Sequence, residues 1–193
     1  MKSQIKNIIQ ESISVKESVL NDENLIGEIE KIITIVTNVF KSGGKVFFCG
    51  NGGSAADAQH LAAEFSGRFY FDRSPLFAEA LHVNTSYLTA VANDYGYEYI
   101  YSRLIEAKGS RGDILFGLST SGNSENIIKA FDQARSQSVI TIGFTGAGGG
   151  KMKDHSDYLI AVPSKDTPRI QETHILLGHI ICELVEERMF KKS

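Results

Sequence analysis

The sequence predicts an α/β protein built on a five-stranded parallel sheet flanked by helices. Five short apolar runs are separated by glycine-rich or polar turns and by helical stretches. The runs show little alternation of apolar and polar residues, which is typical of strands buried on both faces of a parallel sheet. They cover residues 45–49, 78–83, 114–118, 139–144 and 158–162.

Helices are expected between these runs and after the last one. The intervening helices are predicted over residues 55–65, 87–92 and 125–136, and a final helix is predicted from residue 168 or 169 to residue 189. Strands interleaved with helices predict a three-layer, Rossmann-like arrangement. Residues 146–150 are glycine-rich and are expected to form a flexible turn after the fourth strand.

Two long helices are predicted before the first strand. The first carries apolar residues on one side, namely Ile5, Ile8, Ile9, Ile13, Val19 and Leu20. The second has a similar stripe from Leu25 to Phe40 and ends before Gly43 and Gly44, residues that often follow a helix. Because one layer over the sheet does not need two such helices, we expect their remaining apolar surface to contact another subunit.

Length and composition predict a single cytoplasmic domain. A chain of 193 residues can bury an adequate core as one domain, here a helical pair over 1–42 and a ligand-binding core over 43–193. Its net charge of −3 provides no basic surface for nucleic acid, which favours a small ligand. Cys49 and Cys182 lack metal-ligand spacing, and no apolar run approaches the roughly 18 residues of a membrane span. The N-terminus also lacks the apolar region of a signal peptide, so no membrane partner is expected.

A hydroxyl-rich loop follows the third predicted strand. It contains Ser119, Thr120, Ser121, Gly122, Asn123 and Ser124. In parallel α/β folds, ligands bind where strands end and helices begin, and hydroxyl and N–H groups at this point can hold a phosphate. The alternative is that these side chains only cap the next helix, but a cap requires one hydroxyl and the loop offers four.

A second candidate loop, residues 49–54, follows the first predicted strand. Its Gly50-x-Gly52-x-x-Ala55 pattern matches a loose dinucleotide fingerprint, and Asp72 lies where an acidic residue could bind a ribose. A nicotinamide-dependent dehydrogenase is therefore an alternative. The aromatic run before Asp72 does not look like a second core strand, however, and this alternative gives the hydroxyl loop no role.

Two helices carry polar groups that could perform chemistry. His60 and Glu64 are four residues apart on a predicted helix, so they share one face and can bind one metal ion or one substrate. The alternative is an ordinary exposed pair. On the final helix, Glu172 nearly coincides in direction with His179 while Gln171 lies about 80° off register, and the spacing alone does not choose among these groups.

Taken together, these residues resemble the SIS (sugar isomerase) domain family, and within it the phosphoheptose isomerases, over nearly the whole chain. The motifs that carry the resemblance are Cys49-Gly50-Asn51-Gly52-Gly53-Ser54, His60-x-x-x-Glu64, Gly67-Arg68-Phe69, Ala92-Asn93-Asp94, Ser119-Thr120-Ser121-Gly122-Asn123-Ser124, Gly149-Gly150-Lys151-Met152, and Arg169-Ile170-Gln171-Glu172 with His179. The resemblance implies the interconversion of sedoheptulose 7-phosphate and D-glycero-D-manno-heptose 7-phosphate, which supplies heptose for lipopolysaccharide, capsule or another glycan. It also implies a homotetramer with active sites between subunits.

The resemblance further implies which residues form the site. One zinc ion per subunit is expected at His60, Glu64, Gln171 and His179. The expected substrate contacts are Asn51, Gly52, Gly53, Asn93, Asp94, Ser119, Thr120, Ser121 and Ser124, with Glu64 and Gln171 beside them and Ser54 added by its position. The chain has Pro168 where many relatives carry a polar or acidic residue, which affects the substrate rim rather than the metal ligands.

Ketose and aldose interconvert when a base removes a proton from one carbon and an acid returns it to the neighbouring carbon. We expect Glu64 to be the base and His179 the acid, with zinc polarising the carbonyl. Two further alternatives stay open at this stage. One is a non-catalytic SIS protein that binds a sugar phosphate, although such a protein has no need of His60, Glu64 and His179 together. The other is an isomerase for a different phosphorylated sugar.

Overall fold

The structure is a computed structural model that describes residues 1–191; residues 192–193 of the predicted domain lie outside the described residues. At its centre is a five-stranded sheet in the order β2-β1-β3-β4-β5, with every neighbouring pair parallel. The strands are β1 (Val46–Gly50), β2 (Ala78–Ala80), β3 (Ile114–Ser119), β4 (Ile140–Thr145) and β5 (Tyr158–Ala161). The predicted five-stranded parallel sheet is confirmed.

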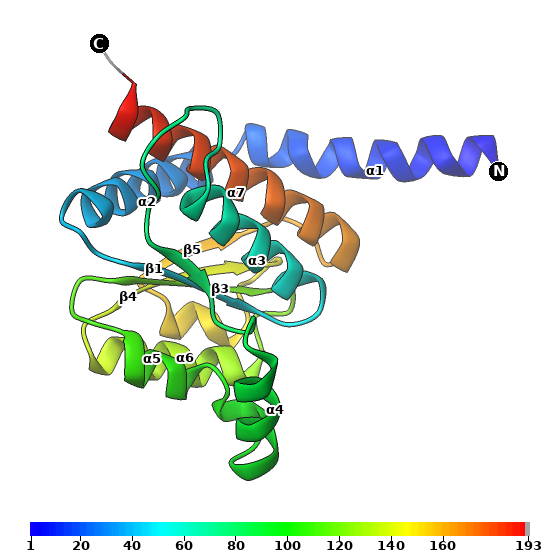
Figure 1. The fold of residues 1–193 in the computed structure, drawn as a ribbon. Helices are drawn as coiled ribbons and strands as arrows, with labels where there is room; N and C mark the ends of the chain where they lie inside the picture. The colour runs from blue at the N-terminus through cyan, green and yellow to red at the C-terminus, as the bar shows by residue number, and fades with distance from the viewer. Residues whose placement is uncertain (192–193) are drawn as a thin grey trace.

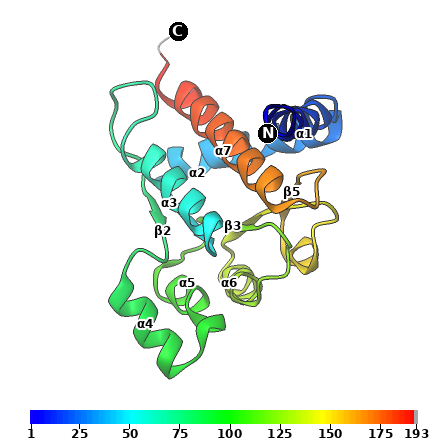
Figure 2. The ribbon, with the colours of Figure 1, turned by 90° about the vertical axis from the view of Figure 1, so that its right-hand side faces the viewer.

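Helices cover both faces of the sheet (Figures 1 and 2). One face is covered by α2 (Glu23–Lys41), α3 (Gly53–Ser66) and α7 (Thr167–Phe190), and the other by α5 (Ser102–Lys108) and α6 (Glu125–Ser136). The remaining elements are α1 (Lys2–Leu20), α4 (Thr85–Asp94) and two 3₁₀ helices, η1 (Tyr97–Tyr99) and η2 (Lys151–His155).

Burial on both faces explains why the strands lack an alternating pattern. In β1, Val46 and Phe48 belong to the core under α2, α3 and α7, while Phe47 and Cys49 belong to the core under α5 and α6. Every residue of β1 and β3 is buried. Alternate side chains of one strand therefore enter two different apolar cores, and both need apolar residues.

The structure differs from the sequence-based prediction in its short elements. The strand predicted over residues 78–83 is only three residues long, because β2 is an edge strand that leaves the sheet after Ala80. The helices α5, η1 and η2 were not predicted from the sequence. These have seven, three and five residues, which is too short for a helical repeat to show in the sequence.

Helix α1 projects from the body of the molecule (Figure 1). Its base is tied to α7, because the Arg169 guanidinium donates to the Ile8 carbonyl (2.8 Å) and Lys16 pairs with Glu172 (3.2 Å). The predicted apolar stripe is largely exposed, since Ile5, Ile8 and Ile9 each keep about half of their surface accessible. Among the described residues, no helix is long and apolar enough to cross a membrane.

Candidate active site

The first glycine loop lies at the carboxyl end of β1 and leads directly into α3. Gly52 adopts φ +57°, a conformation that side chains disfavour, and Gly50 has no room for a side chain because the Ser54 backbone lies against it. The N–H of Gly52 has no acceptor within residues 1–191, so it is available to a bound anion at the start of α3. Ser54, added above by position, is only 3% exposed, which argues against direct contact with substrate.

Asn51 links this loop to the opposite face of the sheet. Its amide exchanges hydrogen bonds with the amide of Asn126 at the start of α6 (3.0 and 2.9 Å), and the Tyr97 hydroxyl donates to its Oδ1 (3.1 Å). The glycine loop and the start of α6 are therefore held side by side. A ligand bound between the glycine loop and the start of α6 can therefore contact both of them.

The serine loop at the carboxyl end of β3 gathers three hydroxyl groups. Ser119 Oγ lies 2.8 Å from Ser124 Oγ and 3.5 Å from Ser121 Oγ. Ser124 is the N-cap residue of α6, but its side chain makes no capping hydrogen bond. The alternative that these hydroxyls only cap the helix is therefore not supported. Thr120, beside them, is partly exposed.

The glycine-rich segment after β4 is a packed support for the serine loop and not merely a flexible turn. Met152 N–H donates to the Gly122 carbonyl (2.9 Å), and Lys151 N–H donates to Asn123 Oδ1 (3.0 Å). A side chain on Gly150 would meet the backbone of residues 121 and 122. The predicted turn at residues 146–150 is present after β4, but the sequence did not reveal this contact, because the need for glycine comes from a loop almost 30 residues earlier in the chain.

Asn93 and Asp94 lie at the exposed end of α4. The Asn93 amide donates to Asp94 Oδ1 (2.8 Å), and neither side chain has another hydrogen-bond partner in the described part of the chain. They are the last two residues of α4, four and three residues before Tyr97, whose hydroxyl reaches Asn51. Their predicted contact with substrate stays a prediction.

A second cluster lies between α3 and α7. His60 Nε2 is 2.9 Å from His179 Nε2 and 3.2 Å from Glu64 Oε1, and the three ligand atoms lie within 4.8 Å of one another. The helices approach closely because Gly178 has no side chain: a Cβ there would lie 2.6 Å from the Leu61 side chain. The spacing of His60 and Glu64 thus produced the shared face that the sequence predicted, and the fold adds His179.

The electrostatics of this cluster favour neutral imidazole at His179. Partial burial lowers the pKa of His179, and the neighbouring His60 lowers it further, while Glu64 opposes both effects. Neutral imidazole is the form that binds metal ions. Two imidazole nitrogens and one carboxylate are a donor set that suits zinc, so the residues fit the implied metal.

One residue near this cluster was missed in the sequence. Asp57 lies one turn before His60 on α3, and its Oδ2 is buried with no hydrogen-bond partner in the described structure. Burial raises the pKa of Asp57, and His60 partly offsets that effect. The 57, 60, 64 spacing on one helix face was the available signal.

Gln171 does not join this cluster within one chain. Its carboxamide lies against Gly53 at the start of α3, since a Cβ on Gly53 would be 2.6 Å from its Nε2. Eight residues of α7 separate it from His179, which is about 12 Å at 1.5 Å per residue. The serine and glycine loops and the His60–Glu64–His179 cluster are therefore two separate groups on this chain.

The structure also shows where the other polar side chains of the final helix lie. Glu172 pairs with Lys16 of α1, and His174 is fully buried with its Nε2 3.0 Å from the Thr145 carbonyl. Of the candidates on that helix, only His179 faces His60. This is information that helical spacing alone could not provide.

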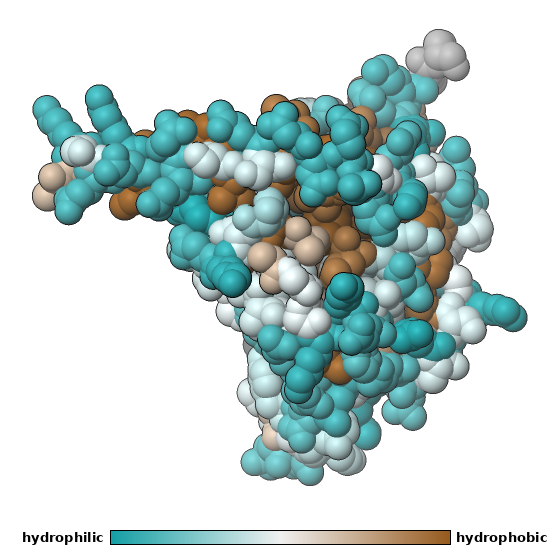
Figure 3. Space-filling view, turned by 180° about the vertical axis from the view of Figure 1, so that it is seen from behind, coloured by the Kyte–Doolittle hydropathy of each residue, from teal (hydrophilic) through white to brown (hydrophobic). Residues whose placement is uncertain are grey.

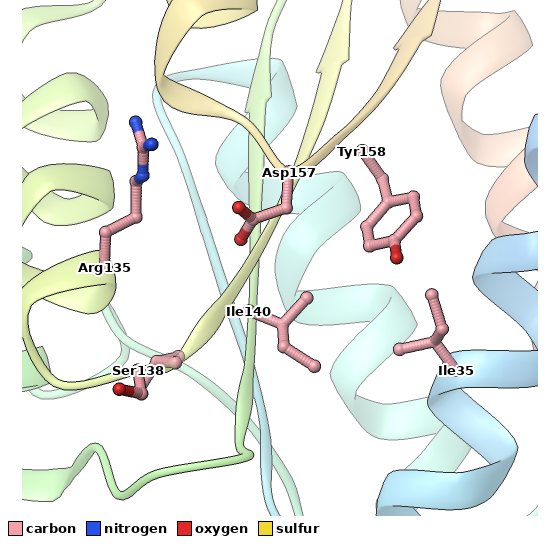
Figure 4. A pocket seen from close by; sticks show the side chains of 7 residues that line it. Ile35, Arg135, Ser138, Ile140, Asp157 and Tyr158 are labelled. Atoms are coloured by element: carbon pink, nitrogen blue, oxygen red, sulfur yellow. The ribbon is translucent and has the colours of Figure 1, made fainter.

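A separate hollow of about 400 Å³ lies at the amino ends of β4 and β5 (Figure 4). Arg135 and Asp157 lie on one side of it, and Ile35 and Tyr158 on the other. Asp157 is occupied in accepting hydrogen bonds from the Thr141 N–H and hydroxyl (2.8 and 3.0 Å). The hollow is at the opposite end of the strands from the glycine and serine loops, so it is not part of the candidate site.

Comparison with known proteins agrees with this fold. A family model described as the SIS domain matches residues 9–146. The chain is 56% identical to a phosphoheptose isomerase of Aneurinibacillus thermoaerophilus over 193 residues, covering all of this chain and 98% of that protein. It is 53% identical to phosphoheptose isomerase 2 of Campylobacter jejuni, covering all of this chain and 96% of that protein.

A solved structure supports the same grouping. The phosphoheptose isomerase of Francisella tularensis superposes with a TM-score of 0.92 at 34% identity, covering 96% of this chain and 97% of that one. The fold and site define a sugar-phosphate isomerase. The chain belongs to the SIS domain family and, within it, to the phosphoheptose isomerases.

Proposed function

We propose that this chain interconverts sedoheptulose 7-phosphate and D-glycero-D-manno-heptose 7-phosphate. The observation that carries the proposal is the presence on one chain of both groups that the reaction needs, a phosphate-binding pair of loops and an acid–base cluster. The loops offer the Gly52 N–H and the hydroxyls of Ser119, Ser121 and Ser124. The cluster offers His60, Glu64 and His179.

The loops bind and orient the substrate. Hydroxyl and backbone N–H donors at the start of α3 and α6 suit a phosphate without a lysine. Asn51, Gly53, Thr120, Asn93, Asp94 and Gln171 complete the proposed substrate contacts. Fixing the phosphate places the far end of the sugar, where C1 and C2 react, at a defined distance, and such positioning can supply several kcal/mol of catalysis.

The acid–base cluster moves the proton. Glu64 is proposed to take the proton from the carbon beside the carbonyl, which produces an enediolate, and His179 is proposed to deliver a proton to complete the exchange. His60 and His179 with Glu64 would hold one zinc ion per subunit, which supplies polarisation of the substrate carbonyl when bound. Gln171 is the fourth proposed ligand.

We further propose that each site combines the loops of one subunit with the cluster of another, in a homotetramer. On this chain, His60 is seven residues along α3 from Gly53, about 10 Å by helical rise, and Gln171 is about 12 Å from His179 on α7. A second subunit can bring its own His60–Glu64–His179 cluster close to the loops of the first. Figure 3 shows apolar side chains along the projecting α1, and the exposed Ile5, Ile8, Ile9 and Ile13 give a second subunit a surface to cover.

A cytoplasmic location is part of the proposal. Cys49 and Cys182 are buried and unpaired, which suits a reducing compartment. The product would then supply the synthesis of an activated heptose for a surface glycan.

Turnover of the substrate itself tests the proposal. Purified protein incubated with sedoheptulose 7-phosphate is expected to form the aldose, followed by NMR, and Glu64→Gln is expected to abolish turnover while still binding substrate. Fructose 6-phosphate serves as a comparison for a different phosphorylated ketose. If sedoheptulose 7-phosphate gives no aldose and fructose 6-phosphate is converted faster, the enzyme acts on another substrate. If neither sugar is converted but both still bind, the chain is a non-catalytic sugar-phosphate-binding protein.

A further inference from the structure

A buried ion pair lies behind the His60–Glu64–His179 cluster. Arg73 Nε donates to Glu186 Oε1 at 2.8 Å, and the two side chains are 2% and 0% exposed. Burying both charges is costly, and an apolar pair of similar size would often serve stability as well. The hydrogen bonds that Arg73 and Glu186 make indicate a role beyond stability.

Glu186 holds the loop that follows α3 against α7. Its carboxylate accepts hydrogen bonds from the backbone N–H groups of Phe69 (2.9 Å), Tyr70 (2.6 Å) and Phe71 (3.0 Å). Figure 1 shows this loop rising beside α7 before the chain returns to β2. Three consecutive backbone donors on one carboxylate fix the position of the loop.

Arg73 holds the end of α3. Its guanidinium donates to the carbonyls of Glu64 (2.9 Å), Phe65 (2.7 Å) and Gly67 (3.1 Å). Those of Glu64 and Phe65 are among the last carbonyls of the helix, which have no partners within it, and Gly67 is the residue that follows the helix. Gly67 has φ −90°, so the helix lacks the left-handed glycine that commonly satisfies such carbonyls, and the arginine does so instead.

The two residues thereby connect to both proposed catalytic groups. Arg73 bonds the backbone of Glu64, and Glu186 fixes Phe69, whose ring lies 5.7 Å from the ring of His179. Glu186 is also on α7 itself, seven residues after His179. One buried pair thus joins the end of α3, the loop over His179 and helix α7.

We propose that Arg73 and Glu186 are positioning residues, which set the separation of Glu64 and His179 by joining the two helices that carry them. This inference rests on the proposed function for its kinetic consequence. The metal-binding consequence depends only on the geometry of the cluster.

The test compares Arg73→Met and Arg73→Lys with the parent. Arg73→Met removes the charge and every donor, and Arg73→Lys keeps a charge opposite Glu186 but cannot bond several carbonyls at once. Both variants are expected to lower kcat at least about tenfold with KM changed less than about twofold, because the glycine loop is at the other end of α3 and the serine loop leads into α6. Both are also expected to weaken Co²⁺ binding about tenfold, measured by the visible absorption of the bound ion, as loss of residues that orient metal ligands commonly does.

A control separates positioning from general loss of stability. Ile105→Ala truncates a fully buried side chain of α5 on the other face of the sheet. This control and the Arg73 variant are compared at urea concentrations chosen so that the two proteins have the same free energy of unfolding. Equal losses of kcat and Co²⁺ affinity in this control would overturn the proposal, as would parent-like values in Arg73→Lys. If Arg73→Met does not fold, Arg73→Lys and its Co²⁺ affinity decide the matter. An inactive parent would refute the proposed function, and the Co²⁺ comparison would still test the positioning.

Discussion

The hydroxyls of the serine loop are proposed to bind the substrate phosphate together. Ser121 and Ser124 each lie within hydrogen-bond reach of Ser119, and the Ser124 side chain does not cap α6. Their spacing was visible in the sequence, since three serines within six residues exceed what a cap requires. What the sequence could not show is the support from residues 149–152, because that contact depends on how β3 and β4 lie side by side.

Replacing all three serines by alanine is expected to weaken binding of inorganic phosphate. Hydrogen bonds to a charged group are worth about 1.5 to 3 kcal/mol each, so the loss should exceed tenfold in affinity. Titration calorimetry measures it. Ser136→Ala is the matched control, because Ser136 ends the same helix and its exposed hydroxyl donates to the Gln133 carbonyl of its own helix. Parent-like phosphate affinity in the triple variant would reduce the loop to a structural turn.

His174 should make stability depend on pH. It is fully buried, and burial lowers its pKa from 6.5 to about 4, an effect that the hydrogen bond to the Thr145 carbonyl only partly opposes. Between these values the unfolded chain binds a proton that the folded chain does not. The contribution of neutral His174 to the free energy of unfolding is therefore fully present above about pH 6.5. It is lost as the pH falls toward 4, by about 3 kcal/mol in total.

His174→Gln removes this titration and keeps an N–H donor for the carbonyl. Urea unfolding of the parent and the variant, both in chelator, gives the free energy of unfolding at several pH values from 7.5 to 4. The parent is expected to lose more stability than the variant over this range. Parallel curves for the two proteins would show that His174 does not contribute.

At the scale of elements, the contact between α3 and α7 creates the acid–base cluster. The sequence predicted both helices and the shared face of His60 and Glu64, because helical periodicity is a local property. It could not select His179 over Glu172 or His174, since that choice depends on which face of α7 meets α3. Among these residues, the tertiary packing turns only His179 toward His60.

Gly178→Ala tests that contact. The added methyl group would lie 2.6 Å from the Leu61 side chain, so α3 and α7 must separate or Leu61 must move. We expect Co²⁺ or Zn²⁺ affinity to fall several-fold and turnover to fall with it. Gly27→Ala on α2 is the control, because no atom of residues 1–191 lies within 4 Å of its Cβ position, and it is expected to be neutral or stabilising by up to about 1 kcal/mol. Unchanged metal affinity in Gly178→Ala would mean that the helix spacing is not set by this glycine.

At the scale of the whole molecule, most of the apolar side of α1 is left exposed by the rest of residues 1–191. The sequence predicted both N-terminal helices and surplus apolar surface, and the structure confirms the helices and the exposure of Ile5, Ile8, Ile9 and Ile13. The number of subunits follows from packing between chains, which neither local periodicity nor the fold of one chain contains. Domain limits at 1–42 and 43–193 likewise remain a prediction.

If the site is shared between subunits, two inactive variants should recover activity when they assemble into one oligomer. Glu64→Gln damages the acid–base cluster, and the triple serine variant damages the loops, so each homo-oligomer should be inactive. In a mixed oligomer, some sites combine the intact loops of one chain with the intact cluster of the other. Random pairing of two chain types in a site built from two subunits restores about one quarter of the sites.

The most direct measurement is therefore the turnover of sedoheptulose 7-phosphate by mixed oligomers of these two variants, formed by co-expression and followed by NMR. Light scattering confirms that the mixture assembles as the parent does. The control mixes Glu64→Gln with His179→Gln, which should stay inactive because both residues belong to one cluster on one chain. A site shared between subunits predicts recovery of about one quarter of parental turnover in the first mixture and none in the control. No recovery in a mixture that assembles normally would contradict the shared site, and with it the proposed arrangement of loops and cluster around one phosphosugar.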